Sequence, residues 1–260
     1  MVDKLSLEET LVSGSKNNLT TIVSETNKAL VVRGVTSKSE IVECQKNKRD
    51  FYYIDTGYLG NFPSVGNTSG KKRWHRVVKN DLQHSVPQNM PSDRWQRLVK
   101  QDPRLQWSGW KNYNKKILLV LPNPKACRYY DIDCEQWINE TTEKIKIYSD
   151  LPIEVRVKGS RSERNHGYSI YSAFDSGVYA TVSFNSIASL ESVLYGIPAF
   201  VSVPCAASPL ASTDLSMLKN LYRPSQETMA KQCHWLAYGQ FTQEEIADGT
   251  AWKILNETSA

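Results

Sequence analysis

ATVSFNSIASLESVLYGIPAFVSV, residues 180–203, has the pattern of a strand, a helix and a second strand. β-Branched and aromatic residues fill both ends, and apolar residues recur at helical spacing between them. Gly196 and Pro198 are expected to end the helix and to begin the second strand. The segment therefore predicts a β-α-β unit of a parallel sheet.

Two further strands are expected on the N-terminal side of this unit. KKILLVLP, residues 115–122, is an unbroken apolar run typical of a strand buried on both faces, and IEVRVKG, residues 153–159, gives another. An amphipathic helix from Asp131 to about Tyr148 lies between them. The alternation predicts a doubly wound α/β lobe over residues 113–260. Its C-terminal helices are expected near residues 212–221, 226–238 and 242–247.

A second, smaller α/β lobe is expected over residues 1–112. Its predicted strands are ALVVRG at 29–34, FYYID at 51–55 and WHRVV at 74–78, with a helix from Ser37 to about Asn47 after the first. Residues 87–113 contain three prolines and no clean periodicity. We interpret that stretch as a linker or an irregular functional region.

Bulk composition excludes some classes of protein. No apolar run approaches the ~20 residues that cross a bilayer, and the N-terminus lacks the apolar core of a secretory signal, so a cytoplasmic protein with no membrane partner is expected. The five cysteines are scattered, and their odd number argues against a closed disulfide framework. The four histidines are far apart, so no metal site is predicted.

Positive charge is concentrated between Lys71 and Lys116, a segment that contains twelve Lys and Arg but only three Asp. Four of the seven tryptophans also lie in this segment. Cations interleaved with aromatic rings suit a phosphate backbone beside exposed bases. The alternative is a solvated region whose tryptophans anchor it to the core. The candidate nucleic-acid-binding residues are Lys71, Lys72, Arg73, Trp74 and Arg76.

Small polar residues gather where the strand ATVSF meets the following helix. In an open parallel sheet, ligands bind at the carboxyl ends of the strands, where backbone N–H groups and hydroxyls approach anions. A diphosphate is therefore expected here, with a carboxylate early in the helix accepting hydrogen bonds from a ribose. The alternative is that Ser186 only caps the helix and that the carboxylate of Glu191 is solvated. The residues concerned are Ser183, Asn185, Ser186, Ser189 and Glu191.

The spacing Ser186-x4-Glu191-x4-Gly196-x-Pro198 resembles the nucleotide-binding half of GT-B glycosyltransferases and of sugar-nucleotide 2-epimerases. The resemblance implies two Rossmann-like lobes with parallel sheets, a diphosphate near Ser186 and Ser189, and a ribose at Glu191. It also matches Lys158 and Arg161 to phosphate-facing basic residues, which could equally be surface charge. The N-terminal half contains FYYIDTGYLGN at 51–61 and RWHRVVKNDLQH at 73–84, and with these stretches it resembles small glycosyltransferase-like proteins encoded by bacteriophages, although it lacks a GxGxxG turn.

Glycosyl transfer with inversion needs a base that takes the proton of the acceptor hydroxyl. Asp55 is the first candidate because it ends a predicted buried strand, and His84 and Asp81 follow. Asp55 could instead form an Asx turn before Thr56 and Gly57, and His84 could be a structural residue at a helix end.

The first functional hypothesis is a phage glycosyltransferase that moves a sugar from a UDP-sugar such as UDP-glucose to hydroxymethylated bases of double-stranded DNA in the host cytoplasm. It requires no metal or cofactor other than the nucleotide-sugar donor. The alternatives are transfer to a surface glycan, epimerisation of the sugar nucleotide, and a binding module without catalysis. The oligomeric state is not predicted.

Overall fold

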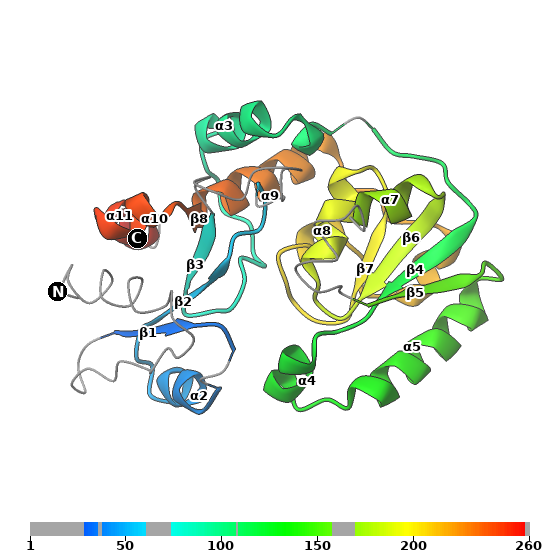
Figure 1. Ribbon diagram of the computed structural model, residues 1–260, viewed down its shortest axis with the longest axis horizontal. Helices are drawn as coiled ribbons and strands as arrows, with labels where there is room; N and C mark the ends of the chain where they lie inside the picture. The colour runs from blue at the N-terminus through cyan, green and yellow to red at the C-terminus, as the bar shows by residue number, and fades with distance from the viewer. Residues whose placement is uncertain (1–28, 36–37, 61–73, 108, 158–169, 258–260) are drawn as a thin grey trace. The chain divides into compact units, whose positions relative to one another are not determined.

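The computed structural model describes residues 29–35, 38–60, 74–107, 109–157 and 170–257 (Figure 1). The chain forms two compact units, called unit 1 and unit 2. Unit 1 comprises Met1–Phe62, Ser69–His84 and Trp235–Ala260, and unit 2 comprises Pro63–Thr68 and Ser85–His234. This division differs from the expected boundary at residues 112 and 113, because the C-terminal segment returns to the N-terminal unit.

Unit 2 contains a four-stranded sheet in which all strands are parallel, in the order β5-β4-β6-β7. These strands are β4 (Lys116–Val120), β5 (Ile153–Arg156), β6 (Val178–Ser183) and β7 (Ala199–Val201). All four lie where the apolar runs predict them. The strand order reverses direction between β4 and β6, which makes their carboxyl ends the topological switch point of the sheet.

Helices cover both faces of this sheet, as the predicted doubly wound arrangement requires (Figure 1). On one face Leu119 packs in a cluster with Ile145, and on the other Leu118 packs in a cluster with Phe174. Successive residues of β4 therefore serve opposite cores, which explains why its sequence is apolar without alternation. The covering helices are α5 (Cys134–Tyr148) on one face and α7 (Ile170–Asp175) and α8 (Ile187–Leu194) on the other, while α4 (Pro124–Tyr130) follows the carboxyl end of β4.

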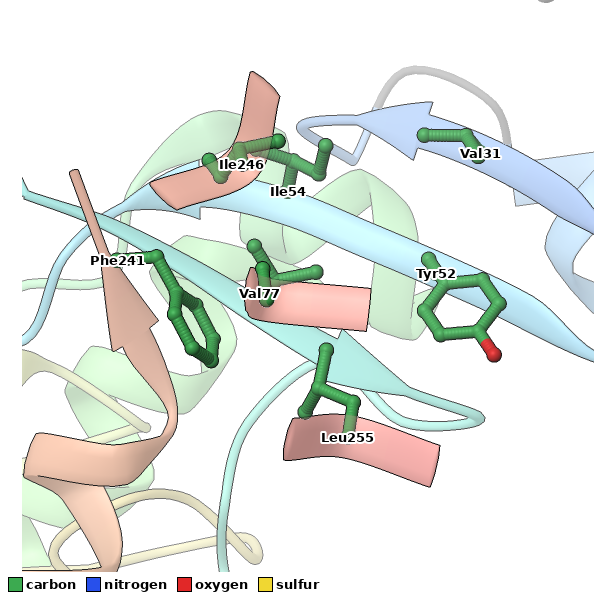
Figure 2. Close-up of a cluster of buried hydrophobic side chains, with 8 residues drawn as sticks. Val31, Tyr52, Ile54, Val77, Phe241, Ile246 and Leu255 are labelled. Atoms are coloured by element: carbon green, nitrogen blue, oxygen red, sulfur yellow. The ribbon is translucent and has the colours of Figure 1, made fainter. Parts of the chain in front are cut away.

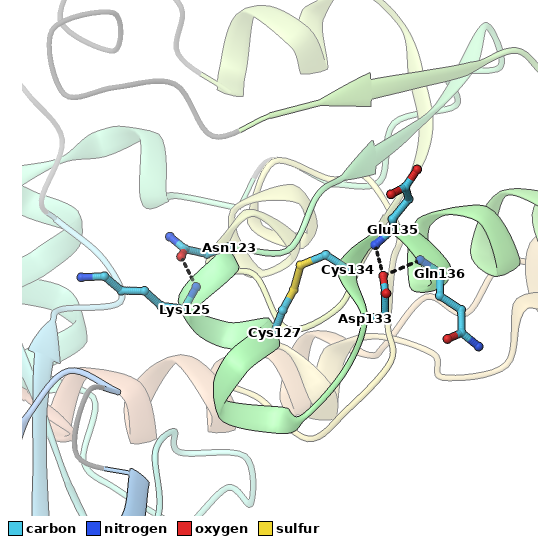
Figure 3. The surroundings of a disulfide bond; sticks show 7 residues. All are labelled: Asn123, Lys125, Cys127, Asp133, Cys134, Glu135 and Gln136. Carbon is cyan, nitrogen blue, oxygen red and sulfur yellow. Dashed lines mark hydrogen bonds between the residues drawn. A yellow bond between two sulfur atoms is a disulfide. The ribbon is translucent and has the colours of Figure 1, made fainter.

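The helix expected from Asp131 begins later, at Cys134. Asp131 has φ +52° and ends α4, so the chain makes a tight turn before Asp133 caps α5 with hydrogen bonds from two backbone N–H groups (Figure 3). This turn brings the Cα atoms of Cys127 and Cys134 to 5.8 Å, and the two residues form a disulfide. The expectation drawn from the odd cysteine count was therefore wrong for this pair, while Cys44, Cys205 and Cys233 are free and buried.

Residues 87–113 are more regular than their prolines suggest. They contain α3 (Asp93–Gln101) and the 3-10 helix η1 (Pro103–Leu105), because the prolines flank α3 and Pro103 stands at the start of η1. Leu98 and Leu105 supply buried apolar contacts. The rest of unit 2 is formed by η2 (Ser208–Leu210), η3 (Leu215–Lys219) and most of α9 (Gln226–Tyr238).

Unit 1 contains a mixed sheet rather than the expected parallel one. Its order is β1-β2-β3-β8, and only β1 and β2 are parallel. β3 pairs antiparallel to β2, and at the end of β2 the Gly57 N–H donates to Trp74 O at 2.8 Å, which extends this ladder by one position. The strands are β1 (Leu30–Arg33), β2 (Phe51–Thr56), β3 (His75–Lys79) and β8 (Gln240–Phe241).

One face of the unit 1 sheet is closed by the end of the chain (Figure 2). Tyr52 and Val77 from the sheet form a buried cluster with Phe241, Ile246 and Leu255. The helices of this unit are α2 (Lys38–Lys46), α10 (Gln243–Ala247) and α11 (Thr250–Glu257), and the last is an addition to the predicted set. No helix among the described residues is long and apolar enough to cross a lipid bilayer.

Candidate donor and acceptor sites

The turn after β6 is a hydrogen-bonded serine cluster at the carboxyl edge of the unit 2 sheet. Ser186 caps α8 by accepting the Ala188 N–H at 3.2 Å, and the Ser186 N–H donates to Ser183 Oγ at 3.1 Å. Ser183 Oγ and Ser189 Oγ are 2.8 Å apart. These bonds bring the first turn of α8 against the end of β6, where the N-terminal N–H groups and the helix dipole favour an anion.

Exposure divides the residues of this turn into two groups. Ser183 and Ser189 are fully buried, so their hydrogen bonds support a structural role, and direct contact with a diphosphate remains a prediction for them. Asn185, Ser186 and Glu191 are partly exposed. The surface that a ligand could reach is therefore formed by Asn185 and Ser186, with Glu191 farther along α8.

The loop after β4 faces the same edge of the sheet. Asn123 follows β4 and caps α4 by accepting the Lys125 N–H at 2.8 Å (Figure 3). Aromatic rings from three elements meet nearby, because Phe184 directly follows β6 and contacts Tyr130 of α4 and Trp137 of α5 edge to face. The disulfide joins the two helices that carry Tyr130 and Trp137.

Glu191 has polar neighbours from segments that are distant in the sequence. It lies close enough to Arg104 and Tyr171 to influence both electrostatically. Arg104 is held by Asp102 through two hydrogen bonds of 2.8 and 2.9 Å, and its guanidinium lies 5.8 Å from the centre of the Tyr171 ring. Burial and then Glu191 raise the pKa of Tyr171, which Arg104 partly offsets, so the phenol stays protonated and can donate a hydrogen bond.

Several predicted ligands cannot be assigned a position. Lys158 and Arg161, together with Lys71, Lys72 and Arg73, lie outside the described residues, as does the predicted cap Ser37. No group of three His, Cys, Asp or Glu side chains that could hold a metal ion occurs within the described ranges.

Asp55 is the penultimate residue of β2 in unit 1, and a polar cluster is built around its carboxylate. Its Oδ2 accepts hydrogen bonds from Tyr53 Oη and Arg76 Nη2, both at 2.9 Å, while its Oδ1 accepts the Thr56 N–H at 2.7 Å. The Asp55 side chain is 39% exposed, whereas that of Arg76 is 10% exposed. A buried guanidinium and a phenol thus fix the orientation of a carboxylate that solvent can reach.

His84 is buried in the same unit. Its Nδ1 is 2.9 Å from Tyr58 Oη, and its ring packs edge to face on Trp235. Burial, with a contribution from the positive charge of Arg76, lowers the pKa of His84 to about 3. The ring is therefore neutral at pH 7, but its burial favours a structural role, and a role as general base stays a prediction. Asp81 is exposed and accepts the Leu82 N–H.

The depressed pKa of His84 predicts a loss of stability in mild acid. The unfolded chain binds a proton near pH 6.5 and the folded chain does not, so His84 stabilises the fold above that pH and loses this contribution as pH falls toward 3. Urea unfolding should show its free energy falling by about 1.4 kcal/mol per pH unit from this group between pH 6 and 4. The His84→Gln variant should be less stable at pH 7, and its free energy of unfolding should change less with pH. If the free energies of unfolding of the two proteins fell in parallel with pH, the depressed pKa of His84 would be contradicted.

Five of the nine described cations of the basic segment pair with carboxylates of the protein. Arg76 is buried against Asp55, and ion pairs engage Lys79 with Asp50, Arg97 with Asp93, Arg104 with Asp102, and Lys116 with Glu154. Arg94 is also buried. Paired and buried charges release few counterions from a nucleic acid, so the described part of this segment gives little support to a DNA-binding surface.

Comparison with known proteins identifies the class of fold. No protein-family model and no curated protein matches the chain. The solved KpsC beta Kdo 2,7 transferase of Thermosulfurimonas dismutans is similar over 98% of this chain and 96% of its own, with 10% sequence identity and a TM-score of 0.52. The beta Kdo 2,4 transferase of KpsC from the same organism covers 85% and 86% at 12% identity and a TM-score of 0.46. The chain therefore has an α/β fold of the kind found in a glycosyltransferase.

Proposed function

We propose that this protein is a glycosyltransferase that uses a nucleotide-sugar donor and a saccharide acceptor. The observation that carries the proposal is the serine-capped N-terminus of α8 at the carboxyl edge of a parallel sheet, next to its switch point. The donor diphosphate or phosphate would lie against Asn185 and Ser186, and Glu191 would accept hydrogen bonds from the ribose hydroxyls. The similarity in fold to a Kdo transferase supports the same activity.

Asp55 is the residue we propose as general base. Its Oδ1 keeps capacity for an acceptor hydroxyl beyond the Thr56 N–H, while Oδ2 is held by Tyr53 and Arg76. Tyr53 and Arg76 act as positioning residues in this scheme.

A saccharide acceptor is preferred to DNA because five of the nine described cations of the basic segment pair with carboxylates and Arg94 is buried. The deciding assay incubates the protein with nucleotide sugars carrying uridine, cytidine or guanosine, and with a saccharide, plain DNA, hydroxymethylated DNA or no acceptor. We expect sugar on the saccharide and release of nucleotide. Sugar on hydroxymethylated DNA would restore the DNA hypothesis, and an altered sugar nucleotide without acceptor would indicate an epimerase.

Glu191→Ala should lower nucleotide affinity by about 10- to 100-fold, because it removes charge-assisted hydrogen bonds to the ribose. Isothermal titration with uridine and cytidine nucleotides on both proteins measures the change. Glu143→Ala is the matched control, since Glu143 is an exposed helical glutamate of the same unit that pairs with Lys146. Equal affinities for the wild type and Glu191→Ala would remove Glu191 from the donor site.

A further inference from the structure

The outer edge of β5 carries an unusual amount of exposed apolar surface. β5 is an end strand of the unit 2 sheet, and no strand among the described residues pairs with its outer side. Val155 is 52% exposed and Val157 is 69% exposed, and Ile147 of the adjacent α5 is 66% exposed. Soluble proteins usually protect such edges with charges, proline or a covering segment.

The backbone of β5 is oriented for pairing on that side. Ile117 N–H donates to Pro152 O and Leu121 N–H donates to Arg156 O, so the even-numbered residues turn their backbone groups toward β4. Because these groups alternate along a strand, the N–H and C=O groups of Ile153, Val155 and Val157 point outward. They are the backbone groups that another strand would use.

We propose that β5 pairs antiparallel with β5 of a second copy of this chain, with the two-fold axis at Val155. In this register Val155 lies opposite Val155 of the partner subunit, and Ile153 lies opposite Val157 of the partner subunit. Both pairs exchange backbone hydrogen bonds, and the sheets of two units join into one. This inference is independent of the proposed catalytic activity.

The register is favoured by charge. Glu154 lies opposite Arg156 of the partner subunit, and Arg156 lies opposite Glu154 of the partner subunit. The Glu154 carboxylate, which pairs with Lys116 of its own chain, would then also face a cation of the other copy. These are the non-hydrogen-bonded pairs of the ladder, in which side chains approach most closely, so two opposite-charge pairs form at once. Because Glu154 and Arg156 stand on either side of Val155, the strand IEVRV is self-complementary about its centre. A shift of two residues in register would lose both opposite-charge pairs.

A cavity beside the strand offers space for the partner. It has a volume of about 470 Å³ and is lined at one end by Ile153 and Val155, with Leu151, Pro152 and residues at the end of α5 around it. Val157 of the partner subunit, which lies opposite Ile153, would bring its exposed side chain to this cavity. Burial of these apolar groups would supply the main free energy of association.

The test is the mass of the protein in solution, measured by analytical ultracentrifugation over a wide concentration range. The wild type should reach twice the mass of one chain. Glu154→Arg places two Arg pairs across the junction and Arg156→Glu places two Glu pairs, so each variant alone should dimerise about tenfold more weakly or worse. An equimolar mixture of the two variants should recover the dimer, because every pair in the mixed dimer again joins opposite charges.

Matched valine variants separate this interface from general effects of added charge. Val155→Lys should abolish the dimer, whereas Val86→Lys, at another highly exposed valine of unit 2, should leave it intact. Thermal unfolding verifies that each variant is folded. A wild type that stays monomeric at the highest concentration, a dimer that survives Val155→Lys in a folded protein, or a mixture that does not associate would overturn the proposal.

Discussion

Asp55→Asn is expected to lower the turnover number by about 10²- to 10⁴-fold, which is the usual contribution of a general base. Asparagine keeps the shape of the side chain but cannot take a proton from the acceptor hydroxyl. The affinity for the nucleotide should not change, because the proposed donor residues belong to unit 2. Initial rates at saturating donor, together with donor titration, measure the two quantities separately.

Asp50→Asn is the control for this experiment. Asp50 stands just before the opposite end of β2 and pairs with Lys79, so it tests the loss of a carboxylate that has no proposed part in the reaction. Asp55→Asn also removes the partner of a buried Arg76, so its thermal stability must be compared with the wild type. A folded Asp55→Asn protein with full turnover would show that the base lies elsewhere.

Gly196→Ala should destabilise unit 2 by about 3 kcal/mol or more. Gly196 has φ +91°, a conformation that an alanine adopts only with strain, and a Cβ there would collide with the backbone carbonyl oxygen of Gly109. That oxygen cannot move freely, because the Lys111 N–H donates to Gly196 O at 2.8 Å and holds the two segments together. The strain and the collision would distort the connection between α8 and β7.

Gly109→Ala separates the two causes of this loss. Gly109 also has a positive φ, +98°, but open space surrounds the position of its Cβ, so only the conformational strain is added. Chemical denaturation should therefore rank the proteins as wild type, then Gly109→Ala, then Gly196→Ala. If the two variants were equally stable, the collision at Gly196 would be contradicted.

The sequence predicts unit 2 better than unit 1, for a physical reason. β4, β6 and β7 are rich in apolar residues on both faces because both faces are buried, and such strands stand out from flanking turns. In unit 1 the pairing of β3 with β8 joins segments that are far apart in the chain. Local patterns cannot reveal that His75 lies opposite Phe241, so this pairing could not be predicted.

The candidate site shows the same limit. The capping role of Ser186 follows from its place before a helix, and the structure confirms it. By contrast, the burial of Ser183 and Ser189 depends on how closely α8 packs on β6, and the neighbours of Glu191 come from η1 and α7. The ion pair of Arg76 with Asp55 arises from strand register, which is why Arg76 was expected at a basic surface.

The return of the C-terminal segment to unit 1 sets an order for folding during synthesis on the ribosome. Unit 2 ends at His234, so all of its strands have been translated while β8, α10 and α11 are still being made. Unit 1 lacks Phe241, Ile246 and Leu255 until these residues have been translated, and its sheet would expose Tyr52 and Val77 to solvent in the meantime. β1 and β2 thus complete their core only after unit 2 has been translated, and termination of synthesis near residue 234 would leave them without it.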